Sequence, residues 1–313
     1  MRLLFVDSNH PVLHETLIEA GFICDTFWDK STDELLKILP LYDGLVIRSR
    51  FKITREIIDR CPQLKCIARV GAGLENIDIN YANSKGIKCL SVPEGNRDAV
   101  GEHALAMLLM LMNNLKNADE EVRRGIWLRA ENRGVEIKGK TVGIIGFGNM
   151  GCAFAKKLRG FDCTILAHDK YKTGFGNECV KEASLNDLFK HADIVSIHLP
   201  LNDETHYYVD DVFLTQFKKP IYLINTARGA CVNTKDLINA IERGQVRGVC
   251  LDVLEYESLS FESIPENEIP EPMKYLINSD KVILSPHIAG WTHESNYNMS
   301  RLIAEKIIAL GKT

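Results

Sequence analysis

Short apolar runs alternate with amphipathic segments along most of this chain of 313 residues, and this alternation constrains the fold most. Apolar runs bounded by polar or glycine residues predict buried strands, and the segments between them have the spacing of amphipathic helices. Strands and helices that alternate in this way predict an α/β fold with parallel, doubly wound sheets. The alternation occurs in two series, so we expect two lobes with a similar βα rhythm.

The first series lies within residues 1–97. Its predicted strands are LLFVD (3–7), GFICDTF (21–27), LVIRS (45–49), KCIARV (65–70) and KCLSV (88–92). The predicted helices between them are HETLIEA, TDELLKIL, TREIID and NIDINYANSKG, and the last ends on Gly86, a residue type that suits a helix C-terminus.

The second series predicts strands at TVGIIGFG (141–148), CTILAHD (163–169), DIVSIHLP (193–200), PIYLINTAR (220–228), VRGVCLDV (246–253) and KVILSPH (281–287). Between 254 and 280 the chain is rich in Glu, Ser and Pro, which predicts an ordered surface loop of low regularity. SNYNMSRLIAEKIIALG then predicts a final amphipathic helix. We expect residues 98–287 to form one lobe, and residues 1–97 together with 288–313 to form the other.

Residues 98–125 interrupt the alternation. They predict one long helix that is apolar in its first half and charged in its second half. The apolar half exceeds what the surface helix of one lobe needs, and we therefore expect a homodimer that forms through this lobe.

Composition excludes several classes of partner. The net charge of −4 gives no electrostatic case for binding nucleic acid or an anionic membrane. MRLLFVDSNH predicts a first strand rather than a signal peptide, and HALAMLLMLM (103–112) is too short to span a membrane. The nine cysteines are scattered without a CxxC pair or zinc spacing. We therefore predict no disulfide and no metal, and a reducing, cytoplasmic compartment.

GFGNMG (146–151) matches the pattern G-x-G-x-x-G, and its context strengthens the match. A predicted strand precedes it and a predicted helix follows it, as in dinucleotide-binding βαβ units. Gly146 would permit the tight turn, Gly148 would let a pyrophosphate approach the backbone, and Gly151 would let the helix pack on its strand. The free N–H groups of the helix N-terminus would bind the phosphates.

Asp169 stands eighteen residues after Gly151, at the end of the next predicted strand. A carboxylate there accepts hydrogen bonds from ribose hydroxyls and repels a 2′-phosphate, which favours NAD over NADP. Lys170 and Lys172 weaken this preference because a nearby cation offsets the repulsion.

Three further polar residues follow predicted strands of the second series: Arg228, Glu257 and His287. Each alone is ordinarily an ion-pairing, solvated or structural residue. Ligands of α/β folds bind outside the carboxyl ends of the strands, so the three together predict a site beside the glycine loop.

With these motifs in place, the chain resembles the D-isomer-specific 2-hydroxyacid dehydrogenases, and specifically a short form without a regulatory domain. The resemblance extends over essentially the whole chain. It is carried by VGAGLENID (70–78), NRDAVGEHAL (96–105), KGKTVGIIGFGNMG (138–151), DIVSIHLPLNDET (193–205), LINTARGACVN (223–233), LDVLEYE (251–257) and SPHIAG (285–290).

The resemblance implies an NAD-dependent enzyme that transfers a hydride between nicotinamide and C2 of a small D-2-hydroxy or 2-keto acid. His287 would be the acid/base, Glu257 would orient its ring and favour the imidazolium, and Arg228 would hold the substrate carboxylate. Closure between the lobes would exclude water. One departure is Ser258, which follows Glu257 where the family commonly has proline, so the loop is expected to hold Glu257 less rigidly.

Other roles follow from the same resemblance. The residues expected to line the cofactor, besides the glycines and Asp169, are Asn149, Met150, His198, Pro200, Thr205, Thr226, Ala227, Asp252, Ala289 and Gly290. His198 equally fits a structural residue at a strand end. The backbone N–H groups of Val70, Gly71, Ala72 and Gly73 would bind the substrate carboxylate.

The substrate is less constrained than the reaction. Arg48 and Arg50 resemble the arginine-rich strand end of phosphoglycerate dehydrogenases and would suit a phosphorylated acid, although Arg50 equally fits a surface residue. Trp291 would wall the substrate pocket or pack against the final helix. We expect 3-phosphoglycerate as substrate, in serine biosynthesis, with hydroxypyruvate or glyoxylate next. An NAD-sensing, corepressor-like binding protein on the same fold is the alternative.

Overall fold

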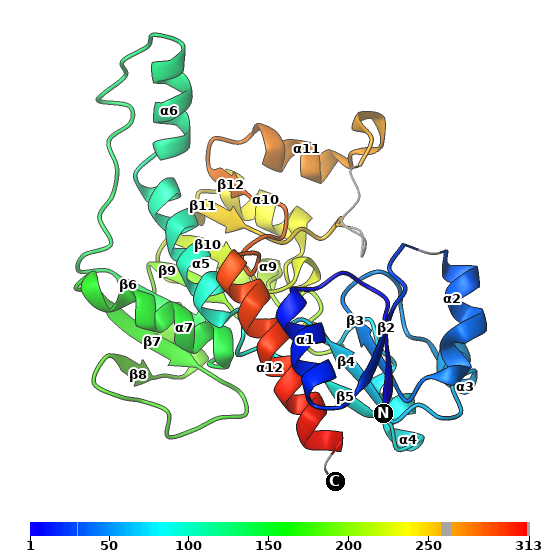
Figure 1. Cartoon of the computed structure of the whole chain (residues 1–313). Coiled ribbons are helices and arrows are strands. Elements are labelled where there is room, and N and C mark those ends of the chain that lie inside the picture. The colour runs from blue at the N-terminus through cyan, green and yellow to red at the C-terminus, as the bar shows by residue number, and fades with distance from the viewer. Residues whose placement is uncertain (30, 258–263, 312–313) are drawn as a thin grey trace. The chain divides into compact units, whose positions relative to one another are not determined.

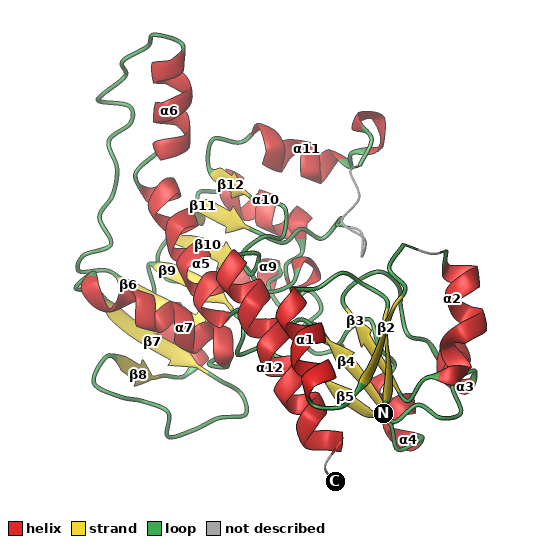
Figure 2. Ribbon diagram, in the orientation of Figure 1, coloured by secondary structure: helices red, strands yellow, loops and turns green. Residues whose placement is uncertain are grey.

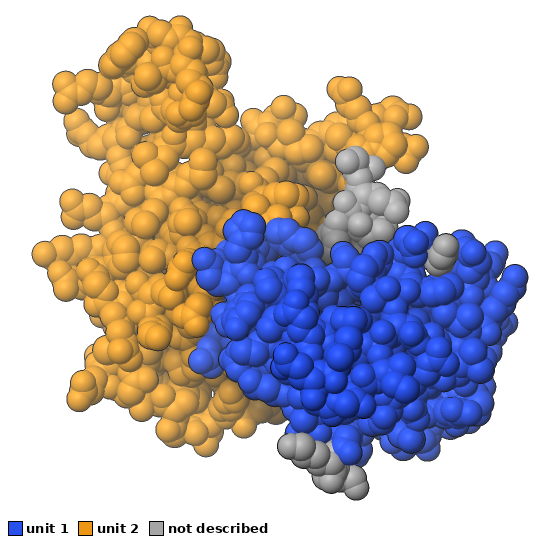
Figure 3. Space-filling model, in the orientation of Figure 1, with its two compact units in different colours: residues 1–97, 258–260, 291–313 blue, residues 98–257, 261–290 orange. Residues whose placement is uncertain are grey.

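The described residues divide into two compact units, each built around its own parallel sheet (Figures 1 and 3). The structure is a computed structural model that describes residues 1–29, 31–257 and 264–311. Within these, one unit comprises residues 1–97 and 291–311, and the other comprises 98–257 and 264–290. The chain thus returns to the first unit at Trp291, three residues later than the sequence predicted, because Ile288 and Ala289 donate backbone hydrogen bonds to Asp252 of the second unit.

The first unit contains a five-stranded sheet in the order β2-β1-β3-β4-β5. Its strands are β1 (Arg2–Phe5), β2 (Ile23–Thr26), β3 (Gly44–Ile47), β4 (Cys66–Arg69) and β5 (Lys88–Leu90). Its helices are α1 (Pro11–Glu19), α2 (Thr32–Ile38), α3 (Arg55–Asp59), α4 (Ile79–Ser84) and α12 (His293–Gly311).

Both faces of this sheet are apolar, as a parallel sheet between two helical layers requires. Leu3 and Phe5 point into one cluster with residues of α1 and α12, and Leu4 and Val6 point into the opposite cluster. Figure 2 shows α1 and α12 side by side, although nearly the whole chain separates them in sequence.

The second unit contains a seven-stranded parallel sheet in the order β12-β11-β10-β9-β6-β7-β8. Its strands are β6 (Thr141–Ile145), β7 (Thr164–His168), β8 (Val180–Glu182), β9 (Ile194–Ile197), β10 (Ile221–Asn225), β11 (Val246–Leu251) and β12 (Val282–Leu284). Its helices are α5 (Arg97–Met112), α6 (Leu115–Arg123), α7 (Asn149–Lys157), α8 (Leu185–His191), α9 (Asp211–Thr215), α10 (Thr234–Glu242) and α11 (Glu271–Asn278).

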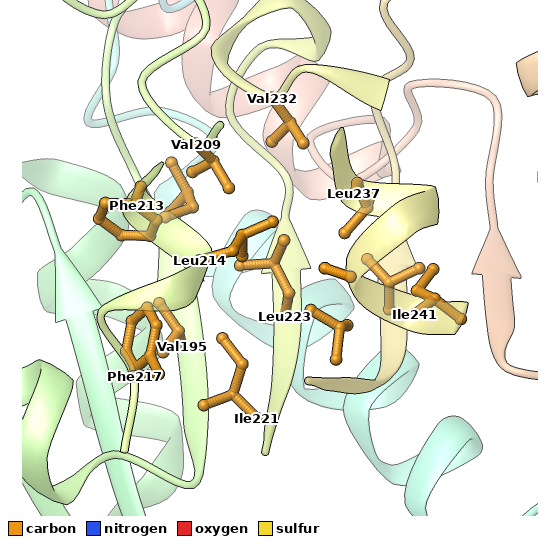
Figure 4. Close-up of a cluster of buried hydrophobic side chains, with 14 of the residues drawn as sticks. Val195, Val209, Phe213, Leu214, Phe217, Ile221, Leu223, Val232, Leu237 and Ile241 are labelled. Atoms are coloured by element: carbon orange, nitrogen blue, oxygen red, sulfur yellow. The ribbon is translucent and has the colours of Figure 1, made fainter. Parts of the chain in front are cut away.

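Alternate side chains of the central strands enter two cores. Figure 4 shows one of them, in which Val195 of β9 and Leu223 of β10 pack against Leu214 of α9 and Leu237 of α10. On the other face, Ile144 and Ile224 pack against Leu108 of α5 and Phe154 of α7. The prediction of parallel α/β sheets in two lobes is therefore confirmed.

The prediction of a single helix over 98–125 is wrong. The helix ends at Met112 and α6 begins at Leu115, because Asn114 takes a left-handed conformation (φ 52°) that asparagine tolerates better than most residues. The returning chain holds this break, since Val135 N–H donates to Met112 O at 2.8 Å and Asn114 Nδ2 donates to Arg133 O at 3.3 Å.

The apolar residues that were expected to be exposed in the first half of this helix are buried, and other apolar residues are exposed instead. Met107, Leu108 and Leu111 of α5 are buried in the core of their own unit. The exposed apolar side chains belong to α6 and the segment after it: Leu115, Val122, Ile126, Trp127 and Leu128.

Three further predictions of local structure differ from the structure. The stretch 254–280 contains α11, whose second residue is Pro272; proline is favoured in the first turn of a helix, whereas its abundance suggested a loop. Residues 258–263 of that stretch, Ser258 among them, lie outside the described residues. β8 is an edge strand with two exposed residues that sequence reasoning missed, and β2, predicted as buried, is an edge strand whose Ile23 is exposed.

Candidate active site

Most of the predicted site residues lie just beyond the carboxyl ends of the strands in the second sheet, along one side of it. Asn225, Leu251 and Leu284, the last residues of β10, β11 and β12, lie in register, and Ile145, His168 and Ile197 end β6, β7 and β9 in the same way. The chain segments that follow these strands therefore leave the sheet at the same level. They carry the glycine loop, Asp169, His198, Arg228, Glu257 and His287.

Steric contacts with backbone oxygens require glycine at the first and last positions of the glycine loop. Gly146 has φ 89°, and a Cβ atom there would lie 2.4 Å from His198 O. A Cβ atom at Gly151 would lie 2.1 Å from Gly146 O, so any side chain would separate α7 from the loop. Around Gly148 a Cβ atom would meet nothing within 4 Å, which leaves this backbone accessible.

Asp169, at the end of the neighbouring strand β7, holds the glycine loop in place. Its carboxylate accepts hydrogen bonds from the backbone N–H of Phe147 at 2.8 Å, Tyr171 at 2.9 Å and Lys172 at 3.0 Å. Burial alone would raise the pKa of Asp169, but the three N–H donors outweigh it and lower the pKa below its ordinary value. The carboxylate is therefore held ionised beside the glycine loop.

These residues fit a dinucleotide. Among the described residues no side chain caps the N-terminus of α7, so its first N–H groups, near the exposed Asn149 and half-buried Met150, have the capacity to bind phosphate oxygens. The buried hydroxyl of Thr226, at the end of β10, has no hydrogen-bond partner among the described residues. A buried polar atom without a partner is rare in a folded chain and is consistent with a ligand at this position.

Several expected cofactor-lining residues also have structural partners. Thr205 Oγ1 donates to Pro200 O at 2.6 Å and closes the turn after β9. His198 Nε2 lies 2.9 Å from Ser196 Oγ, while its Nδ1 is buried without a partner among the described residues. Burial lowers the pKa of His198 to about 4, so the ring is neutral at physiological pH.

The carboxylate of Asp252 organises the loop after β12. Its Oδ1 accepts from Ser285 Oγ at 2.6 Å and from Ile288 N–H at 2.9 Å, and its Oδ2 accepts from Ala289 N–H at 2.9 Å. His103 of α5 completes the network, with Nε2 2.9 Å from Ser285 Oγ and 3.4 Å from Asp252 Oδ1. Burial would raise the pKa of Asp252, but these donors reverse the effect and lower it.

His287 is presented by this loop in an unusual backbone conformation. Its φ is 56°, and its N–H donates to the backbone O of Asp252 at 2.7 Å. Its Nδ1 lies 3.1 Å from Glu257 Oε1 in a half-buried ion pair, and Glu257 Oε2 accepts weakly from Leu254 N–H at 3.4 Å. A carboxylate on Nδ1 fixes the orientation of the ring and favours the tautomer with the proton on Nδ1.

Arg228 lies in the turn between β10 and the short 3₁₀ turn Gly229–Cys231. The buried Asn225 shapes this turn, since its Nδ2 donates to Arg228 O at 2.9 Å and its Oδ1 accepts from Ala227 N–H at 3.0 Å. A Cβ atom at Gly229 would lie 2.0 Å from Leu254 O, so the turn carrying Arg228 contacts the loop carrying Glu257.

In the first unit, Arg48 and Trp291 lie together. The guanidinium of Arg48 stacks over the Trp291 ring, 4.4 Å from its centroid, and Trp291 is 67% exposed. Burial lowers the pKa of Arg48, an effect that Asp7 partly opposes. Among the described residues no carboxylate or carbonyl pairs with the Arg48 side chain.

Arg50 and two of the backbone N–H groups that were expected to bind the substrate have partners within the protein instead. Arg50 Nη1 donates to the carbonyls of Val6 at 3.0 Å and Phe27 at 3.1 Å, so Arg50 joins the ends of two strands. The N–H groups of Val70 and Gly71 are used by Ile47 O and Arg69 O. Of residues 70–73, Ala72 and Gly73 have backbone N–H groups for which the described residues provide no acceptor.

Sequence reasoning missed four supporting residues: Arg69, His103, Asn225 and Gly229. Arg69 Nε donates to Arg48 O at 3.0 Å and its Nη1 donates to Gly73 O at 2.6 Å, which ties the 70–73 loop to the end of β3. Two of the four had a signal in the sequence. His103 is a histidine within the apolar stretch 103–112, and Asn225 is a polar residue at the end of an apolar strand.

Comparison with known proteins identifies the family. The sequence profile of the D-isomer-specific 2-hydroxyacid dehydrogenases, NAD-binding domain, matches residues 105–289. The chain belongs to this family. The predictions of NAD as cofactor and of an NAD-dependent oxidoreductase are thereby confirmed for the family to which the chain belongs.

Curated members of the family carry different substrate names. The chain is 34% identical to D-3-phosphoglycerate dehydrogenase of Archaeoglobus fulgidus over 100% of the chain and 58% of that protein. It is 36% identical to hydroxypyruvate reductase of Thermotoga maritima over 88% of the chain and 87% of that protein. The chain thus spans less than two thirds of the first relative's length.

Solved structures agree on the fold. The solved structure of D-lactate dehydrogenase of Aquifex aeolicus in complex with NAD and lactic acid is 28% identical to this chain, with a TM-score of 0.84. The match covers 100% of this chain and 96% of that one.

Among the described residues of this dehydrogenase-family chain, no helix combines the length and apolar character needed to cross a bilayer.

We predict that Asp252→Asn destabilises the protein at neutral pH. Asparagine replaces one carboxylate oxygen with an NH2 group that cannot accept hydrogen bonds, and its remaining oxygen carries no charge, so the free energy of unfolding should fall by about 2–3 kcal/mol. Because the pKa of Asp252 is lowered in the folded state, this stabilisation is present above the ordinary pKa of 3.8 and is lost as pH falls through the folded value.

Urea unfolding of wild type and Asp252→Asn between pH 7 and roughly pH 3 measures this difference. The gap between them should narrow on acidification, and Asp203→Asn, which removes an exposed carboxylate, should show neither effect. A gap that stays constant with pH would contradict the role given to the carboxylate.

Proposed function

We propose that this protein oxidises or reduces a small D-2-hydroxy or 2-keto acid at C2, with NAD as the hydride carrier. The observation that carries the proposal is the His287–Glu257 pair at 3.1 Å, presented at the same sheet edge as the glycine loop. We assign NAD binding to the unit of residues 98–257 and 264–290, and substrate recognition to the unit of residues 1–97 and 291–311.

The proposed chemistry follows from the groups present. Bound NAD supplies the acceptor for the C2 hydride. His287 Nε2 removes the hydroxyl proton in oxidation and returns it in reduction, while Glu257 stabilises the imidazolium formed in between. Arg228 supplies a planar cation for the substrate carboxylate.

The local structure keeps the proton-transfer group in place. Asp252 binds the N–H groups on the C-terminal side of His287, and its backbone O binds the N–H of His287 itself. The ring therefore does not need to be ordered when substrate binds, which lowers the entropic cost of reaching a reactive geometry.

We further propose a phosphorylated acid, 3-phosphoglycerate, as substrate, with hydroxypyruvate and glyoxylate as the next candidates, and a role in serine biosynthesis. The support is Arg48, whose side chain is desolvated and stacked on Trp291, and whose guanidinium forms no ion pair among the described residues, the Asp7 carboxylate accepting from its backbone N–H instead. A planar guanidinium in that state gains strongly from a bidentate phosphate. The names of the curated relatives include this activity beside two others.

The function is tested with a panel of 3-phosphohydroxypyruvate, hydroxypyruvate, glyoxylate and pyruvate, each with NADH. We expect turnover with at least one acid, and we expect His287→Asn to lower kcat by about 10³-fold or more while NADH binding stays within twofold. Asparagine tolerates the left-handed conformation at this position, so the loop should keep its shape. Tight NADH binding without turnover of any acid would favour the NAD-sensing alternative.

Substitution of Arg48 tests the substrate class. Arg48→Gln should reduce kcat/KM for 3-phosphohydroxypyruvate by about 10–100-fold, because a charge-assisted contact to phosphate is lost, and should leave hydroxypyruvate within about threefold. Arg60→Gln removes the same charge from an exposed position of the same unit and is the control. Equal losses for both acids would reject a phosphate-specific role.

We propose a homodimer formed through the second unit. In Figure 1, α6 and the segment leading to β6 extend away from the sheet of this unit. Val122, Ile126 and Leu128 are exposed there, and Trp127 is 70% exposed. Contiguous exposed apolar residues of this kind mark interaction surfaces.

Sedimentation equilibrium should give about twice the chain mass of 35.2 kDa. Trp127→Glu should shift the protein to a monomer, since it places a charge in the apolar contact. Trp28→Glu changes an exposed tryptophan of the first unit and should leave the dimer intact. A monomeric wild type would refute the assignment.

We also propose a reducing, cytoplasmic location. The buried Cys61, Cys66, Cys231 and Cys250 act as small core residues, and burial raises the pKa of the Cys66 thiol to about 12, which keeps it protonated and unreactive.

A further inference from the structure

Two lysines flank Asp169, and the structure gives each of them a partner. Lys170 Nζ lies 2.6 Å from Glu204 Oε2, and the hydroxyl of Tyr171 donates to the same oxygen at 2.7 Å. Lys172 Nζ donates to Phe147 O at 3.2 Å. Glu204 comes from the turn after β9, where its N–H donates to Asn202 Oδ1 at 3.0 Å.

The segment that carries these lysines is fixed against the glycine loop. Asp169 accepts the N–H of Phe147, and the rings of Phe147 and Phe175 stack with centroids 4.7 Å apart. Gly174 N–H donates to Glu182 Oε2 at 2.7 Å, which ties the segment to β8. The backbone of Lys170 therefore has a defined position next to the Asp169 carboxylate.

That position matters for a dinucleotide bound at the glycine loop. The acid at the end of the second strand of the βαβ unit faces the adenosine ribose, so a 2′-phosphate would lie beside Asp169. Lys170, the next residue, would bind such a phosphate if Glu204 did not hold its ammonium group, whereas Lys172 Nζ already donates to Phe147 O. Asp169 and Glu204 bring two negative charges, and Lys170 and Lys172 bring two positive charges, so this group of four is neutral only because Glu204 is present.

We propose that Glu204 is a specificity-determining residue that reserves this site for NAD by holding Lys170 and Tyr171 away from the 2′ position and by adding a second negative charge there. The inference rests on the proposed function because it requires that the glycine loop bind a nicotinamide dinucleotide. Glu204 and Lys170 are both more than half exposed, with side-chain exposures of 57% and 62%. An exposed pair contributes little to stability, so its loss changes the local charge and leaves the fold intact.

The test compares the affinities of the intact protein for NADH and NADPH, measured by nicotinamide fluorescence without substrate. Glu204→Gln should lower the Kd for NADPH about fivefold, the size of one unit charge acting through water at close range, and should change the Kd for NADH less than about twofold. The gain for NADPH should shrink as salt rises, because exposed charges are screened.

Glu178→Gln is the matched control. Glu178 is an exposed glutamate of the connection between β7 and β8, which also carries Lys170, and no ion pair links it to Lys170 among the described residues. An equal effect of both variants on NADPH, or an equal change for NADH and NADPH in Glu204→Gln, would overturn the proposal. A wild type that binds neither dinucleotide would instead refute the proposed function together with this inference.

Discussion

The site described above depends on one buried carboxylate. Asp252 directly follows β11, and its carboxylate oxygens accept hydrogen bonds from the segment that follows β12. A buried charge is costly unless donors surround it, and here backbone N–H groups, a serine hydroxyl and His103 do so. The same contacts that stabilise the charge fix the loop, and the fixed loop gives His287 its left-handed backbone and its approach to Glu257.

The glycine loop shows a second kind of preorganisation. Its shape is set by the close approach of Gly146 to the end of β9 and of Gly151 to the loop itself. The carboxylate of Asp169 binds the loop from the neighbouring strand end, so the acid expected at the ribose and the loop expected at the phosphates form one unit. In both places an acidic side chain organises the backbone around it.

The sequence predicted most of the fold because its signals are local. Apolar runs specify strands wherever both faces of a parallel sheet are covered, as for Leu3 to Val6 and for β9 to β12. The failures arose where a tertiary contact or a single residue overrode the pattern. The left-handed Asn114 divided one helical pattern in two, and Pro272 began a helix in a stretch that composition assigned to a loop.

The candidate site was predictable in its post-strand residues and not in its supports. Register places Arg228, Glu257 and His287 at one edge, which chain order alone suggested. The residues that hold them act from elsewhere: His103 from α5, Asn225 from within β10, and the Gly229 backbone against Leu254. Arg50, Val70 and Gly71 illustrate the converse, because a motif does not reveal that the protein uses these groups internally.

The division of the chain into units with separate cores has a consequence for how such a protein diversifies. Arg48 and Trp291 belong to one unit, and His287, Glu257 and Asp252 belong to the other. Under the proposed function, substitutions that alter which acid is recognised need not disturb the packing that supports proton transfer. Selection therefore has two largely independent sets of positions on which to act. Relatives with similar sequences and different substrate names are the expected result of that independence.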